Sequence, residues 1–220
     1  MILKNGTLKQ KEKKMKQSTR YLNEIDDVIY DKEWLKTANK DLELYYMQRG
    51  VEKKHDFRYD ITILKPLMLG KEYNKTVGHK HPSNYPELYE VLEGQVIFLL
   101  QNDKHVYAIN AKKTDKIIIP PNYEHIMINA TENEAKTCNW IYEFGNNIYE
   151  TIKQKKGLAY YLIKNNQWIK NPNYTDIPEL EIIEPNKDFS KPIKEFNLQE
   201  LDFLKNPENY TFDKGILKKI

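Results

Sequence analysis

Cysteine is nearly absent from this sequence, since Cys138 is the single thiol among 220 residues. This excludes a disulfide scaffold and a thiolate zinc finger. Cys138 lies in an apolar run, so we expect it to be a small buried hydrophobe. No apolar run approaches the ~20 residues that cross a membrane, and the basic N-terminus lacks the apolar segment of a signal peptide. We therefore expect a cytoplasmic protein that does not enter the membrane.

A strong excess of one charge sign is also missing. The chain carries 35 basic and 32 acidic residues, for a formal net charge of +3. Nucleic-acid binders usually have a more lopsided basic surface, so we expect no nucleic-acid partner. The 40% hydrophobic content is high enough for a folded globular protein.

The pattern along the chain predicts three regions. Residues 1–40 are predicted to form an arm and a short helix, which Asp31 can cap by accepting from free backbone N–H groups. Residues 41–170 are predicted to form one barrel. Residues 171–220 hold five of the ten prolines and one candidate strand, 179–183. We expect them to form an extended arm that wraps the barrel or a partner subunit.

The middle region is a series of short strands. Apolar and alternating segments at residues 42–47, 59–64, 106–109, 117–119, 126–128, 138–144 and 158–163 are separated by Asn, Asp, Gly and Pro. A longer segment, 89–101, is interrupted at Gly94, where a tight bend or bulge is expected. A single helical turn is expected at 149–156. This spacing is typical of an all-β sandwich or barrel.

Four residues of this region have the spacing of a metal site. His79 and His81 are two apart, so in an extended strand they project to the same side. Glu87 follows after a proline-containing turn that can bring its carboxylate beside them. His125 follows a turn fixed by two prolines. Each residue alone is weak evidence, but together with Gly94 and the segment 120–129 they match both halves of the cupin signature.

Three histidines and one carboxylate suit one divalent ion such as Fe, Mn, Ni, Co or Zn. In six-coordinate geometry they leave two positions at which a substrate with adjacent oxygens could chelate, and the metal would polarise it as a Lewis acid. The hydroxyls of threonines and tyrosines near Gly78 suit a sugar or a phosphate. Each tyrosine could equally be a barrel-lining residue.

Several segments resemble the cupin-type glucose-6-phosphate isomerases over roughly residues 12 to 170. They are 76–81 (TVGHKH), 86–89 (PELY), 92–94 (LEG), 99–101 (LLQ), 119–125 (IPPNYEH) and 149–152 (YETI). The resemblance implies an all-β cupin fold, a double-stranded β-helix or jelly-roll-like barrel with a few short helices and the C-terminal arm. It also implies a homodimer that interconverts glucose 6-phosphate and fructose 6-phosphate in glycolysis and gluconeogenesis.

The resemblance further implies residue roles. The metal ligands would be the four residues already identified: His79, His81, Glu87 and His125. Glu87 would also transfer the proton between C1 and C2, unless the hydrogen moves by a metal-assisted hydride shift. The family's phosphate-binding groups correspond to Thr62, Thr76, Gly78 and Tyr89. Its sugar-contacting tyrosines correspond to Tyr45, Tyr142 and Tyr149.

Two departures from the family keep other functions open. The loop between His81 and Glu87 is one residue shorter than usual. Near Tyr149 the family often carries a histidine that assists ring opening or substrate binding, whereas this chain has residues 146–148 (NNI), and asparagine cannot shuttle a proton as imidazole can. The alternatives are a non-haem metal oxygenase of the cupin class and a sugar-phosphate-binding protein without turnover.

Overall fold

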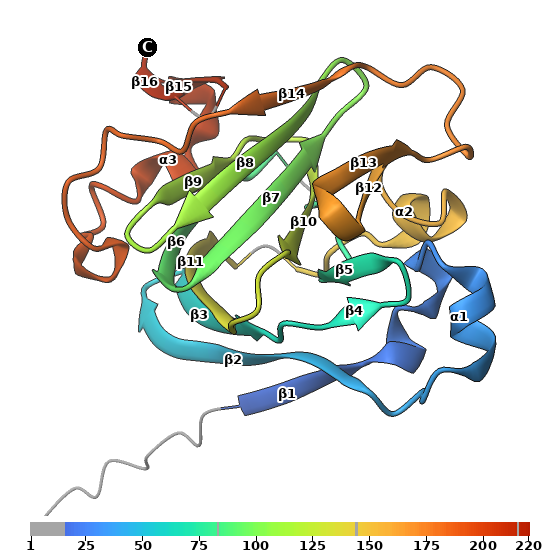
Figure 1. Ribbon diagram of the computed structural model, residues 1–220. Coiled ribbons are helices and arrows are strands. Elements are labelled where there is room, and N and C mark those ends of the chain that lie inside the picture. The colour runs from blue at the N-terminus through green and yellow to red at the C-terminus, as the bar shows by residue number, and fades with distance from the viewer. Residues whose placement is uncertain (1–15, 83, 144, 215) are drawn as a thin grey trace, which may run out of the picture.

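Two β-sheets form the body of the protein in the computed structural model, which describes residues 16–82, 84–143, 145–214 and 216–220 (Figure 1). Residues 1–15 of the expected N-terminal arm lie outside the described residues. The first sheet contains, in spatial order, β1 (Lys16–Tyr21), β2 (Glu43–Lys54), β3 (Phe57–Leu64), β11 (Ala135–Tyr142), β6 (Glu87–Glu93) and β9 (Lys116–Ile119). The second contains β13 (Gln167–Lys170), β12 (Tyr160–Ile163), β5 (Glu72–Lys75), β10 (Glu124–Asn129), β7 (Gln95–Gln101), β8 (Val106–Lys112) and β14 (Leu180–Ile183), with β4 (Met68–Leu69) beside β5.

The chain passes repeatedly from one sheet to the other. β6 and β7 are separated by Gly94 alone, yet they belong to different sheets, so the expected bend at this glycine is confirmed. β10 and β11 also lie in opposite sheets. Neighbouring strands pair antiparallel, except that β14 runs parallel to β8. The two sheets face each other around a common core, and this confirms the predicted cupin barrel.

The helices are short. α1 (Lys32–Thr37) begins after Asp31, whose Oδ1 accepts a hydrogen bond from Trp34 N at 3.1 Å, as the cap prediction requires. α2 (Glu150–Gln154) confirms the expected single turn before Gly157. α3 (Asp202–Lys205) lies in the C-terminal region. Five 3₁₀ turns are described, at Leu22–Glu24, Asp26–Val28, Lys164–Asn166, Ile193–Glu195 and Pro207–Asn209. No helix in the described residues is both long enough and apolar enough to span a membrane.

The N-terminal segment is built into the barrel. β1 pairs with β2 and forms the edge of the six-stranded sheet. The segment that follows it contributes Leu22, Ile25 and Ile29 to the main core, each with 0% exposure. The proposed boundary at residue 40 therefore coincides with no break in the packing.

The C-terminal region contains more regular structure than the sequence indicated. β14 confirms the candidate strand at 179–183. The hairpin of β15 (Tyr210–Asp213) and β16 (Ile216–Lys219) was not expected, and neither was α3. These elements are too short for sequence periodicity to show, and their apolar residues reach burial only through contact with the barrel.

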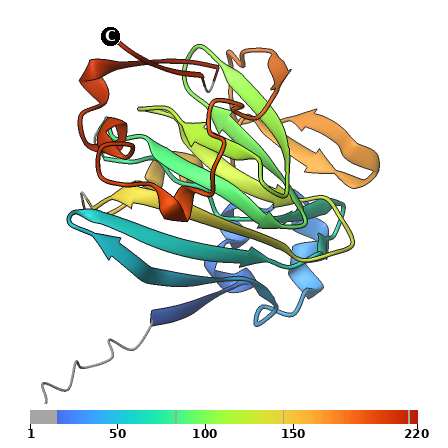
Figure 2. The ribbon, with the colours of Figure 1, turned by 90° about the vertical axis from the view of Figure 1, so that its left-hand side faces the viewer.

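The part of this region that follows β14 lies against the outer face of the six-stranded sheet, as the red segments in Figure 2 show. Trp140 of β11 is fully buried, and its Nε1 donates a hydrogen bond to the carbonyl of Ile193 at 2.8 Å. The Ile193 amide donates to Glu90 of β6, also at 2.8 Å. Phe203 and Leu204 of α3 belong to the same apolar cluster as Trp140. The tail thus forms a second core on this chain's own barrel.

The substitution Phe203→Ala is expected to lower the free energy of unfolding by about 3–5 kcal/mol, because it empties a fully buried aromatic site. Urea unfolding followed by tryptophan fluorescence would measure it. Leu198→Ala, at a side chain 41% exposed, is the control and should change the midpoint little. If Phe203→Ala left the urea midpoint of the main unfolding transition unchanged, the tail would contribute nothing to the stability of the barrel.

Candidate metal centre and substrate cavity

The backbone brings His79 and His125 together. His125 N donates to the carbonyl of His79 at 3.1 Å, and His79 N donates back to the carbonyl of His125 at 3.3 Å. This isolated antiparallel bridge continues the pairing of β5 with β10 beyond the end of β5. The two imidazole rings lie 4.3 Å apart, centroid to centroid. Lys80 forms a similar bridge with Ile148 and so holds the segment before α2 beside the histidines.

His81 and Glu87 complete the group. The carbonyl of Tyr85 lies 2.8 Å from His81 Nδ1, and since a carbonyl can only accept, this nitrogen carries the proton. The lone pair of His81 is therefore on Nε2, which lies 3.3 Å from Glu87 Oε2. His125 Nε2 lies at the same distance from that oxygen. The other two histidines, His55 and His105, are exposed.

The four side chains fit a bound metal ion. One donor atom from each of His79, His81, Glu87 and His125 lies within 4.8 Å of all the others. Neighbouring ligands of one ion at 2.0–2.2 Å are separated by about 3 Å, close to the measured 3.3 Å. Glu87 Oε2 and both ring nitrogens of His125 are buried without a hydrogen-bond partner. Such buried lone pairs are costly unless something binds them, and a divalent cation does so.

The protonation states agree with this interpretation. Burial, reinforced by repulsion from His125, holds the pKa of His79 well below its usual value of 6.5. Burial also lowers the pKa of His125, although Glu87 opposes the shift. Burial alone would raise the pKa of Glu87, but the neighbouring His125 and His81 side chains outweigh it and hold that pKa well below its usual range. The site therefore offers neutral imidazoles and an ionised carboxylate, the states that bind metal.

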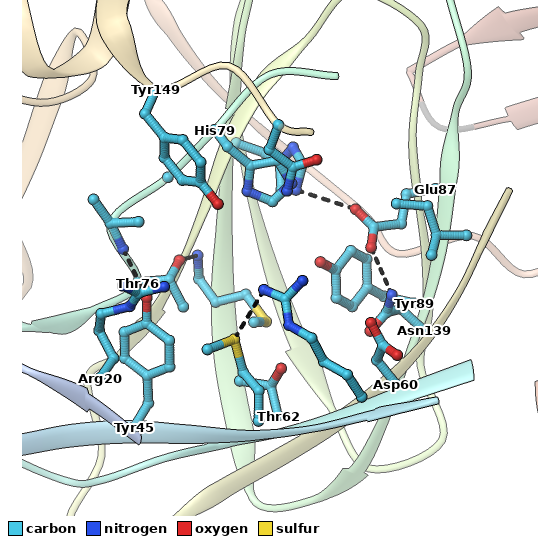
Figure 3. A pocket seen from close by; sticks show the side chains of 18 of the residues that line it. Arg20, Tyr45, Asp60, Thr62, Thr76, His79, Glu87, Tyr89, Asn139 and Tyr149 are labelled. Carbon is cyan, nitrogen blue, oxygen red and sulfur yellow. Dashed lines mark hydrogen bonds and ion pairs between the residues drawn. The ribbon is translucent and has the colours of Figure 1, made fainter. Parts of the chain in front are cut away.

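Asn139 holds the carboxylate from outside and was not identified from the sequence. Its Nδ2 donates to Glu87 Oε1 at 2.6 Å, which leaves Oε2 directed at the histidines (Figure 3). Asn139 stands on β11 opposite Tyr89 of β6. An asparagine within a predicted strand could have suggested a role at the site. Assigning that role to Asn139 required the register of the strands, which the sequence does not give.

The metal centre lies at one end of a cavity between the sheets. Six of the seven predicted substrate-binding residues line it: Tyr45, Thr62, Thr76, Gly78, Tyr89 and Tyr149. Tyr142 does not, because its neighbour Ile141 occupies the inward position on β11. Its ring packs against Phe57 and Tyr85 and borders a hollow that adjoins the cavity and shares Arg49, Arg58, Ile141, Asn147 and Tyr149 with it. Tyr142 thus stands beside the cavity and not in its lining, and its contact with the sugar stays a prediction.

Hydroxyl groups gather at the end of the cavity away from Glu87. In Figure 3, Tyr45, Thr76 and Arg20 lie on the side opposite Glu87, Tyr89 and Asn139. Thr76 Oγ1 accepts from Met127 N at 3.0 Å, which fixes the hydroxyl against β10. Gly78 has φ +81°, and a Cβ there would lie 2.5 Å from Ile126 Cγ2. Only glycine allows the backbone to pass this close to β10 and remain open to the cavity.

Charged and amide side chains missed from the sequence also line this cavity. They are Arg20, Arg49, Arg58, Asp60, Asn139 and Asn147. Asn147 belongs to the stretch where the related isomerases often carry a histidine, so the departure identified in the sequence falls on the cavity wall. The rarity of arginine in this lysine-rich chain could have drawn attention to the three basic residues.

We expect Asn139→Ala to weaken metal binding by about 10–100-fold, because the carboxylate of Glu87 loses the amide that orients it. Titration of metal-stripped protein with Zn²⁺ or Mn²⁺ against a competing chelator would measure the change. Asn110→Ala, at an exposed asparagine on β8, is the control and should bind like the parent protein. Equal affinity in both variants would exclude this role for Asn139.

The metal-free protein is expected to lose stability in mild acid. The pKa values of His79 and His125 are lowered from 6.5 in the folded state, so below about pH 6.5 the unfolded chain binds protons that the folded chain does not. Each of these histidines then costs about 1.4 kcal/mol per pH unit until its folded pKa is reached. Urea unfolding between pH 8 and pH 5 would show a plateau and then a decline, and His125→Asn should make the decline shallower. A flat profile in the parent protein would contradict the assignment.

The sequence profile of the family described as "Glucose-6-phosphate isomerase (GPI)" matches residues 19–179. The glucose-6-phosphate isomerase of Pyrococcus furiosus is 26% identical over 168 residues, which cover 72% of this chain and 88% of the relative. That of Pyrococcus abyssi is 28% identical over 170 residues with the same coverage, and that of Thermococcus litoralis is 28% identical over 120 residues, 52% of this chain and 63% of the relative. The protein belongs to the glucose-6-phosphate isomerase family.

Proposed function

We propose that this chain interconverts glucose 6-phosphate and fructose 6-phosphate as a metal-dependent isomerase, a step of glycolysis and gluconeogenesis. One observation carries the proposal: the buried cluster of His79, His81, Glu87 and His125 shares a cavity with threonine and tyrosine hydroxyls. An aldose–ketose isomerisation needs a Lewis acid or base at C1 and C2 and an anchor for the phosphate at C6. The cavity offers both at opposite ends.

The proposed metal ligands are the three histidines and Glu87. Imidazole and carboxylate donors suit Fe, Mn, Ni or Zn, and one such ion per subunit is proposed. When bound, the ion would polarise the substrate's carbonyl oxygen and acidify the neighbouring C–H group.

Thr62, Thr76 and the backbone at Gly78 are proposed to receive the phosphate. Burial raises the pKa of Tyr45, although Arg20 opposes the shift. Burial and the charge of Glu87 hold the pKa of Tyr89 well above its usual value. Both phenols therefore keep their protons at neutral pH and can donate hydrogen bonds to sugar or phosphate oxygens. Tyr149, whose ring lies 6.0 Å from that of His79, is proposed to contact the sugar near the metal end.

Glu87 is proposed to carry the proton between C1 and C2 in addition to binding metal. Its low pKa keeps it ionised, and so able to accept a proton, but also makes it a weak base. Asn139 occupies Oε1, so any transfer must use the side of the carboxylate that faces the cavity. No cavity-lining histidine other than the ligands occurs among the described residues, and Asn147 lines the wall instead. We infer that ring opening depends on the metal centre or on solvent. Homodimerisation and a cytoplasmic location remain predictions.

The protein stripped with chelator and reloaded separately with Fe, Mn, Ni or Zn is expected to convert fructose 6-phosphate to glucose 6-phosphate in a coupled assay. Turnover should require metal, because the carbonyl is polarised only by the bound ion. Full metal occupancy without turnover for any of the four ions would refute the proposed function. Binding of sugar phosphate in that case would favour a binding protein, and metal-dependent O₂ consumption would favour an oxygenase.

Glu87→Gln provides a second arm of the same experiment. At equal metal occupancy, loss of the proton carrier should reduce kcat about 10²–10⁴-fold. Glu93→Gln is the matched control, since this carboxylate stands on the same strand, β6, with its side chain 66% exposed. If Glu87→Gln turned over normally at full metal occupancy, Glu87 would have no role in proton transfer and would be a metal ligand only.

A further inference from the structure

Arginine is confined to the cavity in this protein. The sequence contains three arginines, and its other 32 basic residues are lysines. Arg20, Arg49 and Arg58 all line the cavity, whereas none of the described lysines does. Arginine differs from lysine in presenting a planar fork of donors that matches a phosphate or carboxylate and in being more weakly hydrated. This distribution indicates that the cavity binds an anion through guanidinium groups.

The three arginines differ in how their charges are balanced. Arg20 Nη1 pairs with Glu24 at 2.6 Å. Arg58 Nε lies 2.9 and 3.0 Å from the two oxygens of Asp60, and its Nη1 lies 3.4 Å from Glu143. Arg49 Nη2 contacts only the thioether of Met47, at 3.5 Å, and has no carboxylate partner among the described residues. Arg49 is therefore the cation of the cavity wall whose charge the described part of the chain leaves uncompensated.

A local irregularity in β2 holds Arg49 at the cavity. Tyr45, Met47 and Arg49 alternate along the strand and face inward together. The register with β3 shifts between Gln48 and Glu52, so Arg49 lies within the irregular stretch, and Gly50 takes φ +66°. Gly50 N donates to Asp60 Oδ1 at 2.8 Å, so the carboxylate that binds Arg58 also fixes this bulge. Bulges of this kind redirect side chains beside functional sites.

Arg49 is also within reach of the proposed phosphate subsite. Met47 pairs with Thr62 across the two strands, so Arg49 is the diagonal neighbour of Thr62 on the cavity face. Diagonal neighbours are about 7–8 Å apart, a gap that a long side chain spans. Arg49 lines the same cavity as His79 and Tyr89, and its charge adds to the effect of burial in lowering the pKa of His79.

The charges of the site balance a phosphate monoester. A divalent ion bound by one carboxylate leaves about one positive charge, and Arg49 adds another, whereas Arg20 and Arg58 are paired. A phosphate monoester carries about −1.5 to −2 at neutral pH. We propose that Arg49 binds the phosphate of the substrate together with Thr62 and is the residue that selects phosphorylated over free sugars. The identity of the sugar rests on the proposed function, whereas the phosphate site does not.

The test uses the full-length, metal-loaded protein and two substitutions, Arg49→Met and Arg49→Lys. Calorimetric titration with inorganic phosphate and with fructose 6-phosphate measures binding, and the coupled assay measures KM and kcat. Arg49→Met should weaken both ligands and raise KM by about 10–100-fold, because a charge-assisted bond is lost. The value of kcat at saturating substrate should change less than about threefold. Arg49→Lys keeps the charge without the fork, so its affinity should be intermediate.

Lys113→Met is the control, because it removes the same charge from an exposed turn. Its phosphate affinity should equal that of the parent protein. Unchanged phosphate affinity in folded, metal-loaded Arg49→Met would overturn the proposal, as would a fall in kcat with phosphate affinity intact, since Arg49 would then act at the reacting carbons. If the parent protein shows no isomerase turnover but Arg49→Met still loses phosphate affinity, the phosphate site is supported and the proposed function fails.

Discussion

The rest of the site depends on the buried carboxylate of Glu87. An ionised group removed from water must be compensated. The amide of Asn139 donates to one oxygen, and the other oxygen lies 3.3 Å from the Nε2 atoms of His81 and His125. The pKa of Glu87 is held well below its usual range in these surroundings, whereas burial lowers the pKa values of His79 and His125 and keeps both imidazoles neutral. The same arrangement places lone pairs from three separate segments around one point. A cation at that point would bind Glu87 Oε2 and His125 Nε2, which are buried and otherwise without a hydrogen-bond partner.

The barrel makes this convergence possible by joining segments far apart in sequence. His79 and His125 meet through two backbone hydrogen bonds, so their relative position is determined by the sheet rather than by side-chain rotamers. Glu87 begins β6 in the opposite sheet, and Asn139 stands beside it on β11. The C-terminal region covers the outer face of that sheet with Trp140, Phe203 and their neighbours. The inner face of the sheet therefore lines the cavity, and the C-terminal region shields the outer face from solvent.

The charge of the cavity wall differs from one end to the other, because some of its charged side chains are paired and others are not. The metal end combines one carboxylate with neutral imidazoles. The wall also carries Arg49 without a carboxylate partner in the described chain, and Arg58 is neutralised by Asp60. Because Asp60 also binds the amide of Gly50, it couples the shape of the strand to the position of a cationic side chain. The opposite end offers hydroxyls and a glycine backbone that can bind phosphate oxygens, and the charge of Arg20 at this end is paired with Glu24.

The sequence by itself identified the four residues that cluster, because the separation of two residues between His79 and His81 and the proline-fixed turns before Glu87 and His125 are local constraints. It also determined the β-rich character, the helix cap at Asp31 and the bend at Gly94, each through short-range backbone chemistry. Only the tertiary structure decided that Asn139 orients Glu87, that Tyr142 stands beside the cavity and not in its lining, and that the three arginines meet there. These facts depend on strand register, where a shift of one residue reverses the face that a side chain occupies. Register is established by pairing between segments distant in the chain, and local patterns carry no record of it.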